Sequence, residues 1–207
     1  MFKKIKANNQ SIAQRKLVYG VGINDAEYMT LMIVDGKTKN CPIYSKWKSM
    51  LSRCYSPKEQ LKSPTYIGCF VCDEWLIFSN FKKWMTQQDW QGKEIDKDCI
   101  KPGNKIYCKE FCAFINKATN MLLNPHSSKR GVHPRGVTFD DQSRLFRSRV
   151  NFNGKSKHLG YFENINDASD AYIKAKVEII LNAALGQKDP RVSNGLRLHA
   201  DILLNGC

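Results

Sequence analysis

The stretch Leu145-Phe-Arg-Ser-Arg-Val-Asn-Phe152 decides the fold of the C-terminal third of this chain. Small or apolar side chains occupy every second position, and the positions between them carry Arg147, Arg149 and Asn151. Successive side chains of a β-strand point to opposite faces of the sheet. The alternation therefore predicts a strand that packs one face on a core and presents guanidinium and amide groups on the other.

The sequence on both sides of this strand predicts a sheet covered by one helix. Gly136 to Phe139 and Lys157 to Phe162 are two further strand-like runs, and Asn153-Gly154 is typical of a tight hairpin turn, which needs positive φ at both central positions. From Asn166, a candidate cap, small residues recur at helical spacing and let a helix lie close on a sheet. We expect a three-stranded antiparallel sheet packed on one helix.

Such a sheet has the dimensions to enter a DNA major groove, where arginine pairs with guanine and asparagine with adenine. The alternative is a face that is only solvated. The neighbouring Lys155, Lys157 and His158 favour nucleic acid over the solvated face.

Four short segments resemble a known family of DNA-binding domains: Arg135-Gly136-Val137, Phe146 to Val150, Leu159-Gly160-Tyr161-Phe162 and Ala168 to Tyr172. They are similar to the plant ethylene-response-factor (Apetala-type) domain, which also occurs in phage endonucleases and lays its sheet in the major groove. Carried over by position, the resemblance implies a DNA-facing set made of Arg135, Thr138, Arg147, Arg149, Asn151 and His158. Thr138, Asp140 and His158 stand where plant domains prefer Arg, Arg and Trp, so the plant target sequence does not carry over.

The charge of the chain agrees with a polyanionic partner. It has 207 residues and a formal net charge of +14. Residues 1–24 carry +5, residues 37–63 carry +6 and residues 124–163 carry +5, whereas residues 64–123 are nearly neutral and rich in carboxylates. A positive field of this size attracts nucleic acid, and an anionic membrane surface is the weaker option. No apolar run is long enough for a membrane span and no secretory signal is evident, so we expect a cytoplasmic protein without a membrane partner.

Two cysteine pairs in the centre form a candidate zinc site. Cys69 and Cys72 have the spacing of a zinc knuckle, and Cys108 and Cys112 form a second, looser pair about 35 residues further on. Four thiolates from two such pairs could hold a tetrahedral zinc. The alternative is ordinary buried thiols.

The remaining central segments predict helices and a hairpin. Apolar spacing predicts a helix from Pro42 that ends at Ser56-Pro57, and a second helix capped by Ser79-Asn80. Glu94 to Ile100 and Lys105 to Phe114 are expected to form two strands around a Pro-Gly-Asn turn, with a helix from Asn116 to Asn124. The breaker-rich Pro125 to Gly131 follows as a link.

This order of hairpin and helix resembles the HNH nuclease core, in which an Asp-His pair ends the first strand and a helix residue completes a metal site. The resemblance places Asp96 on the first metal ligand and Asn120 on the helix ligand, and it implies a divalent cation such as Mg²⁺. Lys97 stands where the family has its base histidine, and a lysine amine is protonated at pH 7 and cannot accept a proton. Asp98 is the candidate substitute base.

The sequence as a whole predicts an α+β protein in four segments: a basic arm and strand (1–40), a helical, HNH-like module (41–124), an Apetala-type domain (131–186) and a C-terminal helix (187–207). Nearly the whole chain resembles phage-encoded HNH proteins of the homing type. Two functions follow: a phage-type endonuclease that binds double-stranded DNA through its sheet and nicks it with a metal ion, or a catalytically silent DNA-binding regulator or inhibitor of a host DNA-processing or defence system. A third class, an inhibitor that binds a host protein, is weaker. The expected setting is the cytoplasm of a bacterial host.

Overall fold

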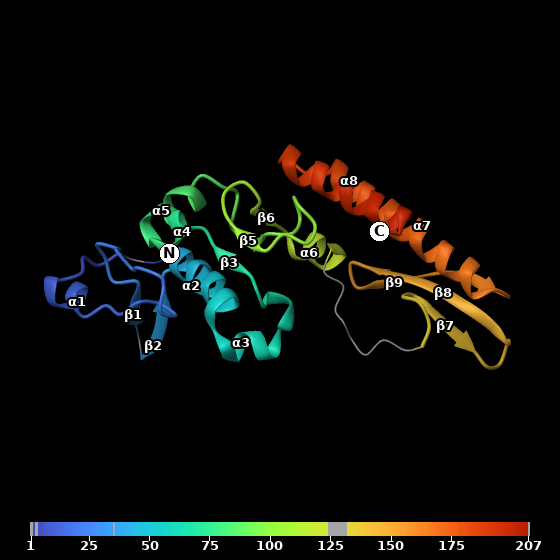
Figure 1. Ribbon diagram of the computed structural model, residues 1–207, viewed down its shortest axis with the longest axis horizontal. Coiled ribbons are helices and arrows are strands. Elements are labelled where there is room, and N and C mark those ends of the chain that lie inside the picture. Colours follow the sequence, from blue (N-terminus) through green and yellow to red (C-terminus); the bar gives the residue numbers. More distant parts are fainter. Residues whose placement is uncertain (1, 3, 35, 124–131, 207) are drawn as a thin grey trace. The chain divides into compact units, whose positions relative to one another are not determined.

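A computed structural model of the protein describes residues 2, 4–34, 36–123 and 132–206. The fold is α+β (Figure 1). The chain forms two compact units, which are described separately: an N-terminal unit of residues 1–98 and 103–114, and a C-terminal unit of residues 99–102 and 115–207. The link predicted from Pro125 to Gly131 lies outside the described residues.

Short elements make up the N-terminal unit. Its helices are α1 (Asn9–Ala13), α2 (Pro42–Tyr55), α3 (Pro57–Lys62), the 3-10 turn η1 (Pro64–Tyr66), α4 (Asp73–Leu76) and α5 (Phe78–Met85). Its strands are β1 (Leu31–Val34), β2 (Lys37–Asn40), β3 (Phe70–Val71), β4 (Glu94–Asp96) and β5 (Ile106–Tyr107), with β6 (Ala113–Ile115) at its boundary. β1 pairs with β2 in antiparallel fashion, β3 runs parallel to β5, and β4 pairs with β6.

Helix α2 supplies the centre of the N-terminal core, as its spacing predicts. Trp47, Met50 and Leu51 are fully buried on one side of it, and the helix ends before the predicted proline. Trp47 Nε1 donates a hydrogen bond of 2.7 Å to the Trp75 carbonyl. A buried indole N–H needs a hydrogen-bond acceptor of this kind, because a buried donor without one lowers the stability of the fold.

Two predictions in this unit are wrong. The second helix begins at Phe78, so Ser79 lies inside it, and Asp25 caps it from a distant segment by accepting from Ser79 N at 2.9 Å. The two long strands of the expected hairpin are short, and β5 pairs with β3. A local cause is Asn104, whose side-chain amide donates to the Lys97 and Ile106 carbonyls at 2.9 and 2.6 Å and replaces ladder hydrogen bonds.

The C-terminal unit has the predicted sheet. β7 (Val137–Asp140), β8 (Leu145–Phe152) and β9 (Lys155–Phe162) form an antiparallel sheet in the order β7-β8-β9. The Asn153-Gly154 turn has φ values of 50° and 73°, which confirms the predicted hairpin. α6 (Lys117–Leu123) precedes the sheet in the chain.

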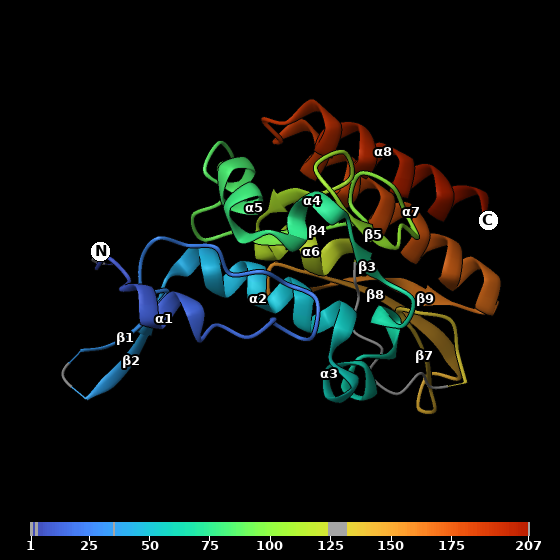
Figure 2. The ribbon, with the colours of Figure 1, turned by 60° about the vertical axis from the view of Figure 1, so that its left-hand side comes forward.

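Two long helices complete this unit. α7 (Ile165–Leu185) covers one face of the sheet, and α8 (Pro190–Asn205) packs on α7 (Figure 2). The cap of α7 is Asn164, which accepts from Asn166 N at 2.8 Å, so the predicted cap lies two residues too far along the chain. Asp189 and Pro190 begin α8 as expected. None of the helices in the described ranges is long and apolar enough to cross a membrane.

Candidate nucleic-acid interface

The register of the sheet defines a face opposite α7, here called the outer face. Ser148 and Val150 are buried toward the core, so Arg147, Arg149 and Asn151 alternate to the outer side. Residues that pair across strands share a face, and the register adds four neighbours to these three: Thr138, Tyr161, His158 and Ser156.

A β-bulge in β9 decides which side chains reach this face. Beyond the tight turn, Arg149 pairs with His158, but Ser148 pairs with Gly160, so Leu159 is the extra residue. A regular hairpin would have paired Arg147 with Gly160 and turned Tyr161 to the core side, because a one-residue slip moves every side chain to the other face. Gly160 has a φ of +143°, which L side chains rarely adopt.

The bulge therefore adds a residue that sequence patterns missed. Tyr161 is 46% exposed on the outer face, its ring lies 5.0 Å from that of His158, and its hydroxyl donates to Asp140 Oδ2 at 3.4 Å. The same shift pairs Phe162 with Phe146 on the core side. The only sequence feature at this point is Gly160 itself, and a glycine between Leu159 and Tyr161 does not by itself specify a bulge.

The arginines of the outer face make no hydrogen bond or salt bridge among the described residues, and Arg147 lies close enough to Asp140 for its charge to help lower the pKa of that carboxyl. Arg149 is exposed, and neither it nor Arg147 has a hydrogen bond or a salt bridge there. Arg147 Nε and Thr138 Oγ1 are buried beside each other across the β7-β8 pair, and both lack a hydrogen-bond partner. A buried polar atom without a partner costs stability.

Two predicted DNA contacts lie elsewhere. Lys155 pairs with Phe152 and Lys157 pairs with Val150, so both lysines alternate to the side of the sheet that carries α7. Both are exposed. They remain available to phosphates, but they do not share the face of Arg147 and Arg149.

The only carboxylate that alternates to the outer face within the described strands is Asp140, at one end of the sheet. Its oxygens accept from the backbone of Ser143 and Gln142 at 3.2 and 3.0 Å. The hydrogen bond from the Ser143 amide, followed by that from Gln142 and the Tyr161 hydroxyl, lowers the pKa of Asp140. Asp140 therefore caps the start of the turn between β7 and β8.

In the N-terminal unit, the candidate nuclease residues form a closed network. Lys97 is only 5% exposed, and its amine donates to both oxygens of Asp98 at 2.8 and 2.7 Å and to the Asn104 carbonyl at 2.5 Å. Asp96 is buried, and its Oδ1 accepts from Asp98 N at 2.9 Å. The Asp98 carboxylate is therefore held by the buried Lys97 ammonium.

Asn120, the predicted helix ligand, lies on α6 in the C-terminal unit, whereas Asp96 lies on β4 in the N-terminal unit. Asn116 caps that helix by accepting from Thr119 N at 2.7 Å. Within the described part of the chain, no group of three or more His, Cys, Asp or Glu side chains has the geometry of a metal site.

The zinc site at the four central cysteines stays a prediction, and the structure describes all four as free cysteines. Cys69 Sγ lies 3.8 Å from the Thr65 carbonyl, as a buried thiol donor. Burial raises the pKa of the Cys72, Cys108 and Cys112 thiols, most strongly for Cys112.

Comparison of the chain with protein-family models, with curated proteins and with solved structures finds no match.

Proposed function

We propose that this protein binds double-stranded DNA at preferred sites through the outer face of its three-stranded sheet. The observation that carries the proposal is the state of Arg147 and Arg149: two adjacent outward positions of β8 hold guanidinium groups that make no hydrogen bond or salt bridge to the described residues. A guanidinium can pair in bidentate fashion with the O6 and N7 atoms of guanine. Asn151, two positions further along the same strand, has the amide that pairs with adenine.

The face also carries what a DNA-binding sheet needs beyond arginine. Tyr161 and His158 add exposed rings beside the guanidinium groups. The overall charge of +14 supplies the long-range attraction that brings a polyanion to the surface. α7 packs on the opposite face of the sheet, and α8 packs on α7.

Of the two forms of this function, binding without cleavage agrees better with the N-terminal unit. The residue at the position of the HNH base is Lys97, which is fully engaged by Asp98 and Asn104. The Asp98 carboxylate, the candidate substitute base, is occupied by this ammonium. We therefore propose a DNA-binding regulator or inhibitor of a DNA-processing system that has the outline of an HNH protein.

Selection from a pool of random duplexes tests this function. The wild-type protein is expected to enrich a discrete motif containing guanine and adenine, and to leave supercoiled plasmid intact in the presence of Mg²⁺ or Mn²⁺. Failure to enrich any motif would contradict site-specific binding. Metal-dependent nicking that is lost in Asp96→Ala would contradict the silent form and favour the endonuclease.

A further inference from the structure

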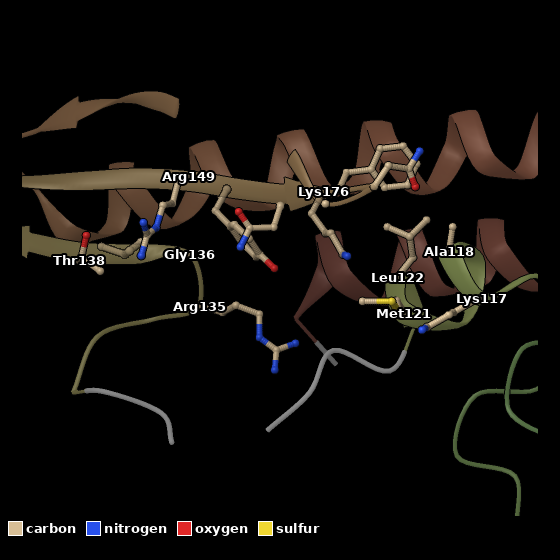
Figure 3. Close-up of a pocket in the computed structure, with 15 residues that line it drawn as sticks. Lys117, Ala118, Met121, Leu122, Arg135, Gly136, Thr138, Arg149 and Lys176 are labelled. Carbon is tan, nitrogen blue, oxygen red and sulfur yellow. The ribbon is translucent and has the colours of Figure 1, made fainter. Parts of the chain in front are cut away.

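Beside the free edge of β8, the C-terminal unit contains a pocket of about 820 Å³ (Figure 3). β7 reaches only as far as the pairing of Val137 with Ser148, so among the described residues no strand pairs with the backbone of β8 beyond Arg149 on that side. Small-molecule sites typically have volumes of roughly 300–1,000 Å³. This pocket is therefore large enough for a ligand of nucleotide size.

One wall of the pocket is apolar. Tyr172 of α7, Val137 of β7 and Phe152 of β8 contribute to it, and α6 adds Met121 and Leu122. A methyl group built on Gly136, which has a φ of +78°, would lie 2.1 Å from the Tyr172 ring, so the glycine allows this ring to lie against the strand. A planar apolar group such as a nucleobase suits a wall of this composition.

The charged groups of the pocket are all cations. Lys117, Arg135, Arg149 and Lys176 line it, and none of its fifteen lining residues is acidic. Figure 3 shows the Lys176 amine and the Arg135 guanidinium extending into the space between the sheet and α6. Such a cluster attracts an anion.

Lys176 is the most informative of these cations. It is only 7% exposed, and no hydrogen bond or ion pair within the described residues reaches its amine. Burial, and then the positive charge of Arg135, lower the pKa of Lys176. Charged lysines are almost never buried unless they are paired, because the desolvation of an unpaired ammonium is costly.

Lys176 thus lies buried in a pocket beside a second cation, without a counterion among the described residues, and an anionic ligand would supply one. We propose that this pocket binds the phosphate ester of a nucleotide, with Lys176 and Arg135 on the phosphate and the apolar wall on the base. The pocket shares Arg149 with the outer face, but the site goes beyond the proposed function because its proposed phosphate ligands, Lys176 and Arg135, are not among the residues of that face. The nucleotide could be free, or it could belong to a DNA strand.

Thermal unfolding of the full chain with deoxynucleoside monophosphates tests the proposal, with the matching deoxynucleosides and inorganic phosphate as probes of each half of the ligand. We expect the monophosphates to raise the Tm more than inorganic phosphate does, and the deoxynucleosides to have little effect. Lys176→Met keeps the apolar stem and removes the charge. It is expected to raise the Tm of the free protein and to weaken monophosphate binding about tenfold or more.

Lys174→Met is the matched control, since Lys174 lies on the same helix and is exposed. It should leave both the Tm and the nucleotide effect unchanged. A Lys176→Met protein that binds monophosphates as wild type does would overturn the proposal, as would a wild type that binds neither monophosphates nor phosphorylated oligonucleotides at this lysine.

A second set of binding measurements, with short duplex and single-stranded oligonucleotides, identifies the source of the phosphate. If Lys176→Met weakens oligonucleotide binding while monophosphates do not bind, the phosphate belongs to a strand. If monophosphates bind through Lys176 and duplex binding is unaffected by the change, the ligand is the free nucleotide. If the wild type selects no duplex motif, the result counts against the outer face and not against this pocket. Failure of the proposed function can therefore be distinguished from failure of this site.

Discussion

Lys97 and Lys176 are both buried lysines, one in each unit, yet their surroundings are opposite. Lys97 has three acceptors from Asp98 and Asn104, and its network holds the loop between β4 and β5 in place. Lys176 has the positive Arg135 nearby and no acceptor among the described residues. Burial alone therefore does not distinguish a structural lysine from one that binds a ligand; the presence of a counterion does.

The largest effect expected from this comparison is at Lys97. Lys97→Met leaves the Asp98 carboxylate and the Asn104 carbonyl without their donor, and should lower the free energy of unfolding by about 2–3 kcal/mol, somewhat less than for a fully buried pair. The expected loss of stability is smaller than for a fully buried pair because the side chain of Asp98 is 28% exposed. Urea unfolding measures the change.

Lys93→Met is the control for this substitution. Lys93 pairs with Asp89 at the same distance of 2.7 Å, but this i,i+4 pair is largely exposed, so the expected loss is below about 0.5 kcal/mol. Equal losses at the two lysines would mean that the Lys97 network adds nothing to an ordinary surface pair.

The bulge of β9 gives the next largest effect. Gly160→Ala places a side chain at a φ of +143° and within 3.1 Å of the Phe162 ring, which should cost about 1–3 kcal/mol in urea unfolding. Gly186→Ala is the control, since Gly186 has a φ of −83° and only one atom, at 3.8 Å, near its added methyl group. Its effect should be close to zero or slightly stabilising. A neutral Gly160→Ala would show that the bulge does not depend on glycine.

The bulge also marks the limit of what the sequence predicts. Three features were predicted because each depends only on neighbouring residues. These are the alternation of β8, the apolar stripe of α2 and the Asn153-Gly154 turn. The bulge was not, because it depends on how Phe162 packs with Phe146 across the sheet. The cap of α5 by Asp25 was also not predicted, because it depends on a contact between two distant segments of the chain.

The candidate sites divide in the same way. Arg147, Arg149 and Asn151 were predicted on one face because strand alternation requires it. The partner of Lys97 was adjacent in the sequence, but its burial and its bond to Asn104 depend on the path of the loop. Lys176 had no signal in the sequence, since a lysine on a long helix is ordinarily solvated.

A smaller effect is expected in the pH dependence of stability. Because the pKa of Lys176 is lowered in the folded protein, the unfolded chain binds more protons between that pKa and the ordinary value of about 10.5, and stability contributed by this site rises with pH in that window. The wild type should thus be less stable than Lys176→Met at neutral pH, and the difference should shrink as the pH approaches 10. Urea unfolding of both proteins at pH 7 and pH 10 measures it. A difference that grows with pH would contradict an unpaired, buried ammonium.

The most direct test of the central claim, that the outer face recognises DNA sequence, is the affinity of Arg149→Ala for a selected duplex and for a scrambled duplex of equal length. The wild type should prefer the selected duplex, and Arg149→Ala should weaken that complex by about 1–3 kcal/mol while changing the scrambled one much less. Lys157→Ala, on the other side of the sheet, should weaken both duplexes to a similar and smaller extent. Equal loss on both duplexes in Arg149→Ala, or a wild type that does not distinguish them, would contradict the account.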